Sequence, residues 1–313
     1  MRPITFIPAD TRIDFVGRRR LAFIFSGILV AVSVVFFAIQ GLNFGIDFRG
    51  GILIEIETGG PVELQDLRGT LGGLDLGEVQ LQEFGAPNNF LIRVQQQKGD
   101  EKAQLAAIQV VKEALGEAVM EYRRTEFVGP TVGAELIRKA TIAVALALGA
   151  ILLYIWFRFE WQFGVGAIVA LVHDVVTTIG LFALTQLEFN LATVAAILTI
   201  AGYSINDTVV IYDRVREAMR KFKKLELPEL LNLAVNGTLS RTVMTSVTTL
   251  LALLALVILG GPIIRDFALA MIWGVVIGTY SSIFIAVPAL LFLHLRGITT
   301  SGGEEEAAEG QGA

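Results

Sequence analysis

The chain has 313 residues, of which 54% are hydrophobic and only 18% are charged, and its mean hydropathy is +0.64. The apolar residues lie in runs long enough to cross a bilayer, which excludes an ordinary soluble protein and indicates an integral membrane protein with one extramembrane domain. The net charge of -5 carries little information, because each side of a membrane must be considered separately. Cysteine is absent, which excludes a disulfide framework and a thiolate metal site.

The N-terminal segment, residues 1–20, is polar and basic, and we expect it to lie in the cytoplasm. A first membrane helix is predicted at 21–41, which is long enough to cross a hydrocarbon core of about 30 Å at 1.5 Å per residue. We expect this helix to be retained, because no signal-peptidase site followed by a soluble start is present. A Gly-rich exit, GLNFGIDFRGG, contains Asp47 and Arg49.

Residues 42–137 are predicted to form an α+β domain with its linkers. Alternating apolar residues predict strands, and helical spacing predicts helices, in the order βαββαβ of a ferredoxin-like split unit. The predicted strands are 52–57, 78–84, 90–95 and 119–127, and the predicted helices are 61–71 and 100–118. Pro61 suits the first turn of its helix, and Asn88 and Asn89 mark a turn. GIDFRGG does not open a helix after a strand, so it is no dinucleotide motif, and the domain shows no metal-ligand spacing or nucleophile–base pair.

The rest of the chain returns to the membrane after VGPTVGAEL. Within residues 138–295, five further membrane helices are predicted at 138–157, 163–186, 191–211, 239–259 and 267–293. A basic loop follows the fourth membrane helix, and PELLNLAVNG is predicted to form an interfacial helix. The acidic tail, 296–313, lacks apolar anchors and is expected to be disordered. Basic residues gather at the N-terminus, after the fourth helix and after the sixth, which predicts cytoplasmic termini and a periplasmic α+β domain.

The fourth membrane helix contains a carboxylate, Asp207, beside Asn206 and one turn after Tyr203. Because a charge inside a bilayer is costly, such a residue usually faces the bundle interior and has a function. The fifth membrane helix contains Arg241. At 1.5 Å per residue, Asp207 lies about 24 Å and Arg241 about 27 Å from the outer face, so the two share one depth. We hypothesise a proton-linked pair; the alternative is that Arg241 snorkels to the interface and Asp207 bonds to a neighbouring helix.

Polar side chains on neighbouring helices fit this hypothesis. Thr245 and Thr248 share a face of the fifth helix with Arg241, and His173 and Asp174 share a face of the third with Thr177 and Thr178. These residues either hold water that carries protons or form interhelical hydrogen bonds worth about 1 kcal/mol or less. The sixth helix carries a small residue at every fourth position from Ala270 to Ala286, which predicts close packing against another helix.

Several long motifs, in order, resemble the SecF family of protein-export membrane subunits, within the resistance-nodulation-division transporter superfamily. The motifs are GIDFRGG, VGPTVGAEL, RFEWQFG, GYSINDTVVIYDRVRE, SRTVMTSVTTL and GTYSSIFIAVPALL. The resemblance covers residues 15–295 and implies an α-helical polytopic membrane protein with six transmembrane helices and one periplasmic domain between the first two. It also implies that Asp207 and Arg241 are the proton-coupling residues.

The function implied by the resemblance is that of an accessory subunit rather than an enzyme. Such a subunit lies in the bacterial inner membrane and uses the proton-motive force to assist late steps of protein export. SecD would complete a twelve-helix bundle, and the SecYEG translocon, YajC, YidC and the exported unfolded polypeptide are the other implied partners. No cofactor, metal or nucleic acid is implied.

Other classes of function remain open on the residues alone. A proton-coupled exporter of small molecules or lipids from the same superfamily would need a larger outer domain with a pocket. A membrane scaffold would tolerate substitution of Asp207 and Arg241. An intramembrane hydrolase would need a nucleophile and base or a metal motif, which His173 and Asp174 alone do not form.

Overall fold

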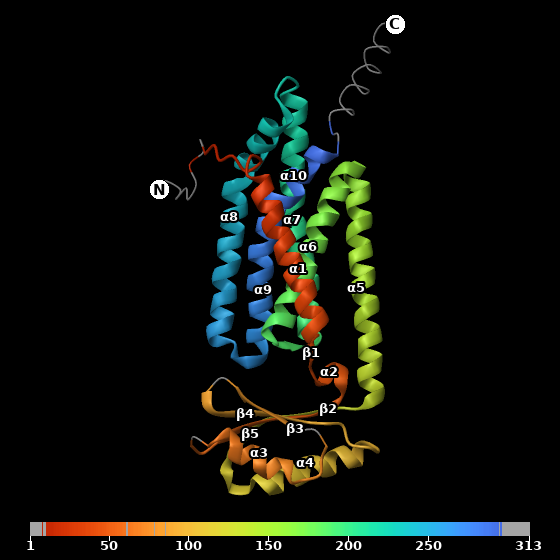
Figure 1. The fold of residues 1–313 in the computed structure, drawn as a ribbon, viewed down its shortest axis with the longest axis vertical. Coiled ribbons are helices and arrows are strands. Elements are labelled where there is room, and N and C mark those ends of the chain that lie inside the picture. The colour runs from red at the N-terminus through yellow and green to blue at the C-terminus, as the bar shows by residue number, and fades with distance from the viewer. Residues whose placement is uncertain are drawn as a thin grey trace. The chain divides into compact units, whose positions relative to one another are not determined.

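The computed structural model describes residues 8, 11–60, 62–77, 79–84, 86–293 and 295. Pro61 and the predicted disordered tail, 296–313, lie outside the described residues. The chain divides into two units (Figure 1), which we call the helical unit and the sheet domain. The helical unit comprises Met1–Gly41, Ala145–Gln186 and Ala195–Ala313, and the sheet domain comprises Leu42–Val144 and Leu187–Val194.

Six helices in the described part of the chain are long and apolar enough to cross a membrane, which confirms the predicted class of fold. They are α1 (Arg19–Gln40), α5 (Pro130–Arg158), α6 (Trp161–Thr185), α7 (Leu191–Lys221), α8 (Leu227–Leu259) and α9 (Gly261–Ser281) with the turns that continue it. About half of the residues in the apolar stretches of α6, α7 and α9 are buried, whereas almost none of those in α5 are buried. The helical core therefore lies among α6, α7 and α9.

The ends of several helices differ from the prediction. The basic residues Arg214, Arg216, Arg220 and Lys221 lie on α7 rather than in a loop, because Arg and Lys are good helix formers and no glycine or proline interrupts them. PELLNLAVNG is not a separate interfacial helix but the first turns of α8, with Pro228 in the first turn. Similarly, α5 begins at Pro130 rather than at residue 138, because proline is favoured in a first turn.

The last membrane helix is interrupted, where one continuous helix was predicted. After α9 come a π-helical turn, η2 (Ser282–Ala286), then α10 (Val287–Ala289) and a 3-10 turn, η3 (Leu290–Phe292). Pro288 explains the change, because it has no N–H for the helix ladder and its ring crowds the preceding turn. The carbonyl oxygen of Ala286 instead accepts a hydrogen bond from the Tyr212 hydroxyl at 3.0 Å.

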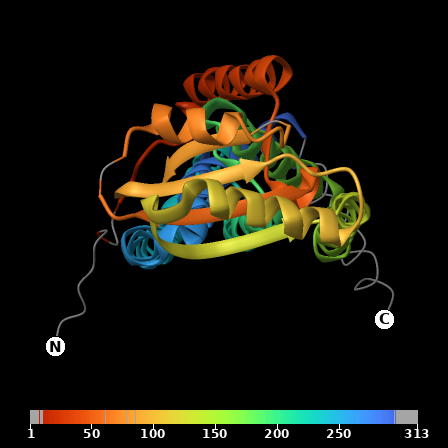
Figure 2. The same ribbon diagram turned by 90° about the horizontal axis from the view of Figure 1, so that it is seen from below.

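The sheet domain has the predicted βαββαβ order. Its strands are β2 (Gly51–Thr58), β3 (Val79–Phe84), β4 (Ala86–Val94) and β5 (Val119–Val128), arranged antiparallel in the spatial order β3-β4-β2-β5. Helices α3 (Leu64–Gly72) and α4 (Glu101–Leu115), followed by η1 (Gly116–Ala118), cover one face of this sheet (Figure 2). Ile54, Ile92 and Phe90 are fully buried in that core. Asn88 and Asn89 lie within β4 rather than in the predicted turn, because the chain reverses before Ala86.

Two short features of the sheet domain were not predicted. One is the helix α2 (Ile46–Arg49) and the other is a parallel pair of two-residue strands, β1 (Asn43–Phe44) and β6 (Glu188–Phe189). An ion pair between Arg93 and Glu188 and a 3.0 Å hydrogen bond from the Leu191 N–H to Asp47 reinforce this pairing. The connection between α6 and α7 therefore belongs to the sheet domain.

Gly50 and Gly51 connect α2 to β2 in backbone conformations that favour glycine, with φ of +71° and +119°. A Cβ on Gly51 would lie 2.7 Å from the carbonyl oxygen of Val94. We expect Gly51→Ala to lower the free energy of unfolding of the sheet domain by about 2 kcal/mol, measured by its protease resistance during urea titration. Gly59→Ala is the control, because nothing lies within 4 Å of its Cβ position. Equal unfolding midpoints for the two variants would contradict this explanation of the glycine pair.

The segment before α1 is bound to the first turns of α8. The side-chain oxygen of Asn232 accepts hydrogen bonds from the N–H groups of Phe15 and Val16 at 3.0 Å, and its amide donates to Asp14 at 2.8 Å. The Gly17 N–H and then the Asn232 amide hold the pKa of Asp14 below its ordinary value. Because the folded pKa is lowered, this contact contributes at neutral pH and is lost as the pH falls through that value.

Asn232→Ala is expected to release this segment, because three hydrogen bonds are lost at once. The measurement is the rate of trypsin cleavage at Arg12. We expect this rate to rise about threefold. Glu229→Ala, at an exposed position on the same helix, is the matched control and should cleave like the wild type. An unchanged rate in Asn232→Ala would show that other contacts hold the segment.

Candidate functional site

Asp207 lies in the middle of α7 and is buried, with 7% of its surface exposed. Its Oδ1 accepts a 2.9 Å hydrogen bond from the Thr242 hydroxyl on α8. Its Oδ2 is buried and has no hydrogen-bond partner among the described residues. A buried carboxylate with one unsatisfied oxygen is unusual and costly, so this oxygen is the place where a proton or another donor would be bound.

Arg241 does not contact Asp207 in this structure. No ion pair within 4.0 Å joins the two among the described side chains, and Arg241 is exposed. The reason is helical phase: successive residues of an α-helix point about 100° apart, so when Thr242 faces α7, Arg241 points to the exposed side. The residue of α8 that contacts Asp207 is therefore Thr242, next to the predicted Arg241.

The other polar residues singled out on α7 and α8 fall into two groups. Tyr203 is half-buried, and its hydroxyl lies 3.4 Å from Ser246, which in turn bonds to Thr279 of α9 at 2.7 Å. Asn206, Thr245 and Thr248 are exposed instead. The Thr245 and Thr248 hydroxyls donate to carbonyls of their own helix, Arg241 and Met244, each at 2.9 Å.

A second carboxylate, Asp174 of α6, is completely buried and is fully engaged. Its Oδ2 accepts hydrogen bonds from Ser204 of α7 at 2.5 Å and from Ser281 of α9 at 2.7 Å. Its Oδ1 lies 2.9 Å from Nδ1 of His173. Asp174 thus joins the three helices of the core, and Ser204 stands one turn before Asp207. The Nε2 of His173 is buried without a hydrogen-bond partner in the described part of the chain.

Ser204, Ser281 and Thr242 were not recognised as site residues from the sequence. The one available signal was their spacing: Ser204 shares a helix face with Asp207, and Ser281 adjoins the small-residue stripe of the sixth membrane helix. The close packing predicted for that stripe is confirmed. A Cβ on Gly278 would lie 3.0 Å from the Cβ of Ser204, and Ser282 bonds to Thr208 at 2.8 Å.

The described residues of the site comprise two buried carboxylates with different hydrogen-bond partners. No group of three or more His, Cys, Asp or Glu that could hold a metal ion occurs among them. Thr242 fixes one oxygen of Asp207 and leaves the other unpaired, while Asp174 is locked by three donors. The two carboxylates therefore differ in environment: one is open to a change of partner and the other is not.

Comparison with known proteins gives matches over almost the whole chain. Residues 108–296 match the family described as protein export membrane protein SecD/SecF, C-terminal, and residues 35–62 match the SecD/SecF GG motif. Protein translocase subunit SecF of Rickettsia rickettsii is 45% identical over 291 residues, covering 92% of this chain and 94% of its own. Protein translocase subunit SecF of Magnetococcus marinus is 52% identical over 287 residues, covering 90% and 92%.

Two solved structures are similar as well. One is SecDF, a translocon-associated membrane protein from Thermus thermophilus, with a TM-score of 0.82 and 40% identity, covering 91% of this chain and 39% of that one. The other is SecDF in a super-membrane-facing form, with a TM-score of 0.70 and 38% identity, covering 97% and 41%. The chain thus spans about two fifths of the length of each SecDF chain.

Proposed function

This chain belongs to the SecF family of protein translocase subunits, and we propose that, together with SecD, it uses the proton-motive force to assist the late steps of protein export. The observation that carries the proton-coupling part is Asp207, a buried carboxylate in a membrane helix, one oxygen of which has no hydrogen-bond partner in the part of the chain that the structure describes. An ionisable residue at such a depth is costly unless it has a function. We propose no enzymatic activity and no cofactor.

The proposed location is the bacterial inner membrane, with the sheet domain in the periplasm. Arg18 is the N-cap residue of α1, Arg19 and Arg20 are its first two residues, and the C-terminal turns of α7 carry Arg214 to Lys221. An excess of Arg and Lys marks the cytoplasmic side of a bilayer, which supports a cytoplasmic N-terminus. The family resemblance extends the proposed partners to the SecYEG translocon, YajC, YidC and the exported polypeptide.

The exposed polar side chains of α7 and α8 support SecD as a partner within the membrane. Asn206, Arg241, Thr245 and Thr248 are exposed on the lone chain, although all lie within helices long enough to span a bilayer. Charged and amide groups facing lipid are costly, so we propose that helices of SecD cover this face. The combined name SecDF of the similar solved structures, which extend well beyond this chain, favours the same partner.

The proposed proton step is a change of partner at Asp207. When Asp207 is ionised, its unpaired Oδ2 attracts the guanidinium of Arg241, one residue from the Thr242 that already binds Oδ1. Protonation removes that attraction and weakens the link between α8 and α7, while Oδ1 still accepts the hydrogen bond from Thr242. Each proton that crosses 100 mV releases about 2.3 kcal/mol, which biases a two-state helix bundle but does not move a polypeptide far, so repeated cycles are required.

Thr242 is expected to position Asp207 for this step. Thr242→Val removes the hydrogen bond to Oδ1 without changing the shape of the side chain, and we expect about tenfold weaker gradient-dependent export. Thr242→Ser is the matched control, because it keeps the hydroxyl and should retain most of the function. Equal loss in both variants would assign the effect to packing, and no loss in either would remove Thr242 from the site.

The experiment for the proposed function uses a strain depleted of its own SecF and supplied with this chain and its matching SecD. Export of a secreted reporter is measured with the proton gradient intact and after its collapse by an ionophore. We expect the benefit of the supplied pair to disappear when the gradient collapses. A benefit that persists without a gradient would favour a scaffold that recruits partners, and a benefit absent in both conditions would contradict a role in export.

A further inference from the structure

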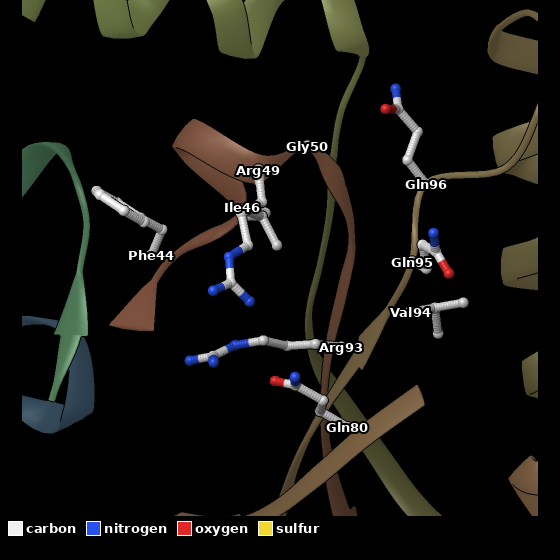
Figure 3. A pocket seen from close by; sticks show the side chains of 9 residues that line it. All are labelled: Phe44, Ile46, Arg49, Gly50, Gln80, Arg93, Val94, Gln95 and Gln96. Carbon is white, nitrogen blue, oxygen red and sulfur yellow. The ribbon is translucent and has the colours of Figure 1, made fainter. Parts of the chain in front are cut away.

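The sheet domain contains a cavity of about 360 Å³ that the proton-coupling proposal leaves unused (Figure 3). Gln80 of β3 and Arg93 of β4 line it, and they are paired in the sheet register. Their neighbours Leu81 and Ile92 are in the core under α3 and α4, and side chains alternate along a strand. The cavity therefore lies on the opposite face of the sheet, where Phe44 and Arg49 complete it.

Among the described residues that line this cavity, the ionised side chains are both arginines and none is a carboxylate. Arg93 is held in place by its ion pair with Glu188, and only 14% of its side chain is exposed. Arg49 is exposed and forms no ion pair within 4.0 Å among the described residues. Figure 3 shows both guanidinium groups directed into the same part of the cavity. The lining thus combines one fixed cation with one that is available to a ligand.

The remaining polar lining consists of amides. Gln80, Gln95 and Gln96 border the cavity, and a smaller adjoining hollow of about 230 Å³ shares Gln80 and Arg93 with it. Asn43 and Gln82 line that second hollow. An amide side chain both donates and accepts hydrogen bonds, as a peptide group does. Guanidinium groups, by contrast, match the geometry of a carboxylate.

We propose that this cavity binds a side-chain carboxylate, Asp or Glu, of an extended polypeptide, with Arg49 as the residue that contacts it. The guanidinium of Arg49, which has no ion-pair partner among the described residues, selects the anion, and the surrounding amides suit the adjacent peptide groups. The identification of the polypeptide as an exported chain rests on the proposed function. An anionic lipid headgroup is the competing ligand, but it offers no peptide groups to the amide side chains of the lining.

The test uses the complete SecD–SecF pair in nanodiscs of phosphatidylcholine. The probes are fluorescent Gly/Ser peptides that carry either Asp or Asn at the same positions, and binding is followed by anisotropy. We expect the Asp peptide to bind about tenfold more tightly than the Asn peptide, as for one charge-assisted hydrogen-bonded contact. Arg49→Gln should abolish this preference, and Arg49→Glu should reverse it in favour of a Lys peptide. Arg68→Gln, at an exposed position on α3, should leave it unchanged.

Equal binding of the Asp and Asn peptides, or an unchanged preference in Arg49→Gln, would overturn the proposal. Competition by glycerol 1-phosphate as strong as that by the Asp peptide would also overturn it, in favour of a lipid headgroup. Export by the same variants separates this proposal from the proposed function. A preference that depends on Arg49, with export independent of the proton gradient, would keep the binding site and remove the coupling. Gradient-dependent export by a protein that shows no preference for the Asp peptide would keep the proton coupling and remove the binding site.

Discussion

Asp207→Asn is expected to abolish the part of protein export that depends on the proton gradient. The amide of Asn has nearly the shape of the carboxylate and can still accept the hydrogen bond from Thr242. Unlike a carboxylate, however, an amide does not take up or release a proton near neutral pH. A single proton at 100 mV contributes about 2.3 kcal/mol, or a bias of about 50-fold, and this is the contribution that the variant loses. The measurement is reporter export in the SecF-depleted strain, with and without a gradient.

Two further variants make this experiment selective. Asp213→Asn lies on the same helix and removes an exposed ion pair with Arg158, at 2.7 Å, so it should export like the wild type. Arg241→Met removes the proposed counter-charge and should resemble Asp207→Asn. Each variant is quantified in the membrane fraction, so that a failure to insert is distinguished from a failure to couple. Normal gradient-dependent export by Asp207→Asn and Arg241→Met would make the pair structural and favour the scaffold interpretation.

Asp174→Ala is expected to destabilise the helical unit, because it removes the acceptor shared by α6, α7 and α9. Ser204 then loses its hydrogen bond to α6, and His173 loses the hydrogen bond to its neighbour, both in buried positions. Ser281 also loses its bond to Asp174 but retains a 3.1 Å bond to the Gly278 carbonyl. Unsatisfied buried groups cost about 1–3 kcal/mol in proteins, and membrane hydrogen bonds fall toward the lower end of that range. We expect a lower Tm for the purified SecD–SecF pair.

Asp174→Asn and Thr185→Ala calibrate this result. Asn keeps one acceptor oxygen for the two serines but places an NH2 group where His173 now meets a carboxylate, so its Tm should lie between those of the wild type and Asp174→Ala. Thr185, near the end of the same helix, is exposed and bonds to its own backbone, so Thr185→Ala should melt like the wild type. Wild-type melting of Asp174→Ala would contradict the role of Asp174 in joining the three helices.

The class of fold was predictable because its signals are long and repeated. The six apolar runs and the βαββαβ pattern of the sheet domain each extend over many residues. An error of a few residues at the end of one element therefore does not change the predicted class of fold. The β1–β6 pair was not predictable, because two residues per strand show no periodicity and their partners lie far apart in the sequence. The continuation of α7 to Lys221 was not predicted, because the hydrophobic run shows where the chain leaves the bilayer and not where the helix ends.

The burial of Asp207 and Asp174 was predictable from the sequence, but their contacts were not. The cost of burying a charge in a bilayer identifies Asp207 and Asp174 without any structure. Which hydroxyl reaches each carboxylate depends on how the helices are rotated about their axes, and that rotation makes Thr242 rather than Arg241 the neighbour of Asp207. Serine and threonine are common in these helices, so Ser204 and Ser281 could not be distinguished from the others until the packing of α6, α7 and α9 was known.

Whether Asp207 carries the proton is measured as proton transfer by the intact SecD–SecF pair in sealed lipid vesicles. A potassium diffusion potential is imposed with valinomycin, and the internal pH is followed with a trapped dye. We expect potential-driven proton entry with the wild type and with Asp213→Asn, and entry no faster than in empty vesicles with Asp207→Asn. Proton entry through Asp207→Asn at the wild-type rate would contradict the claim that Asp207 carries the proton.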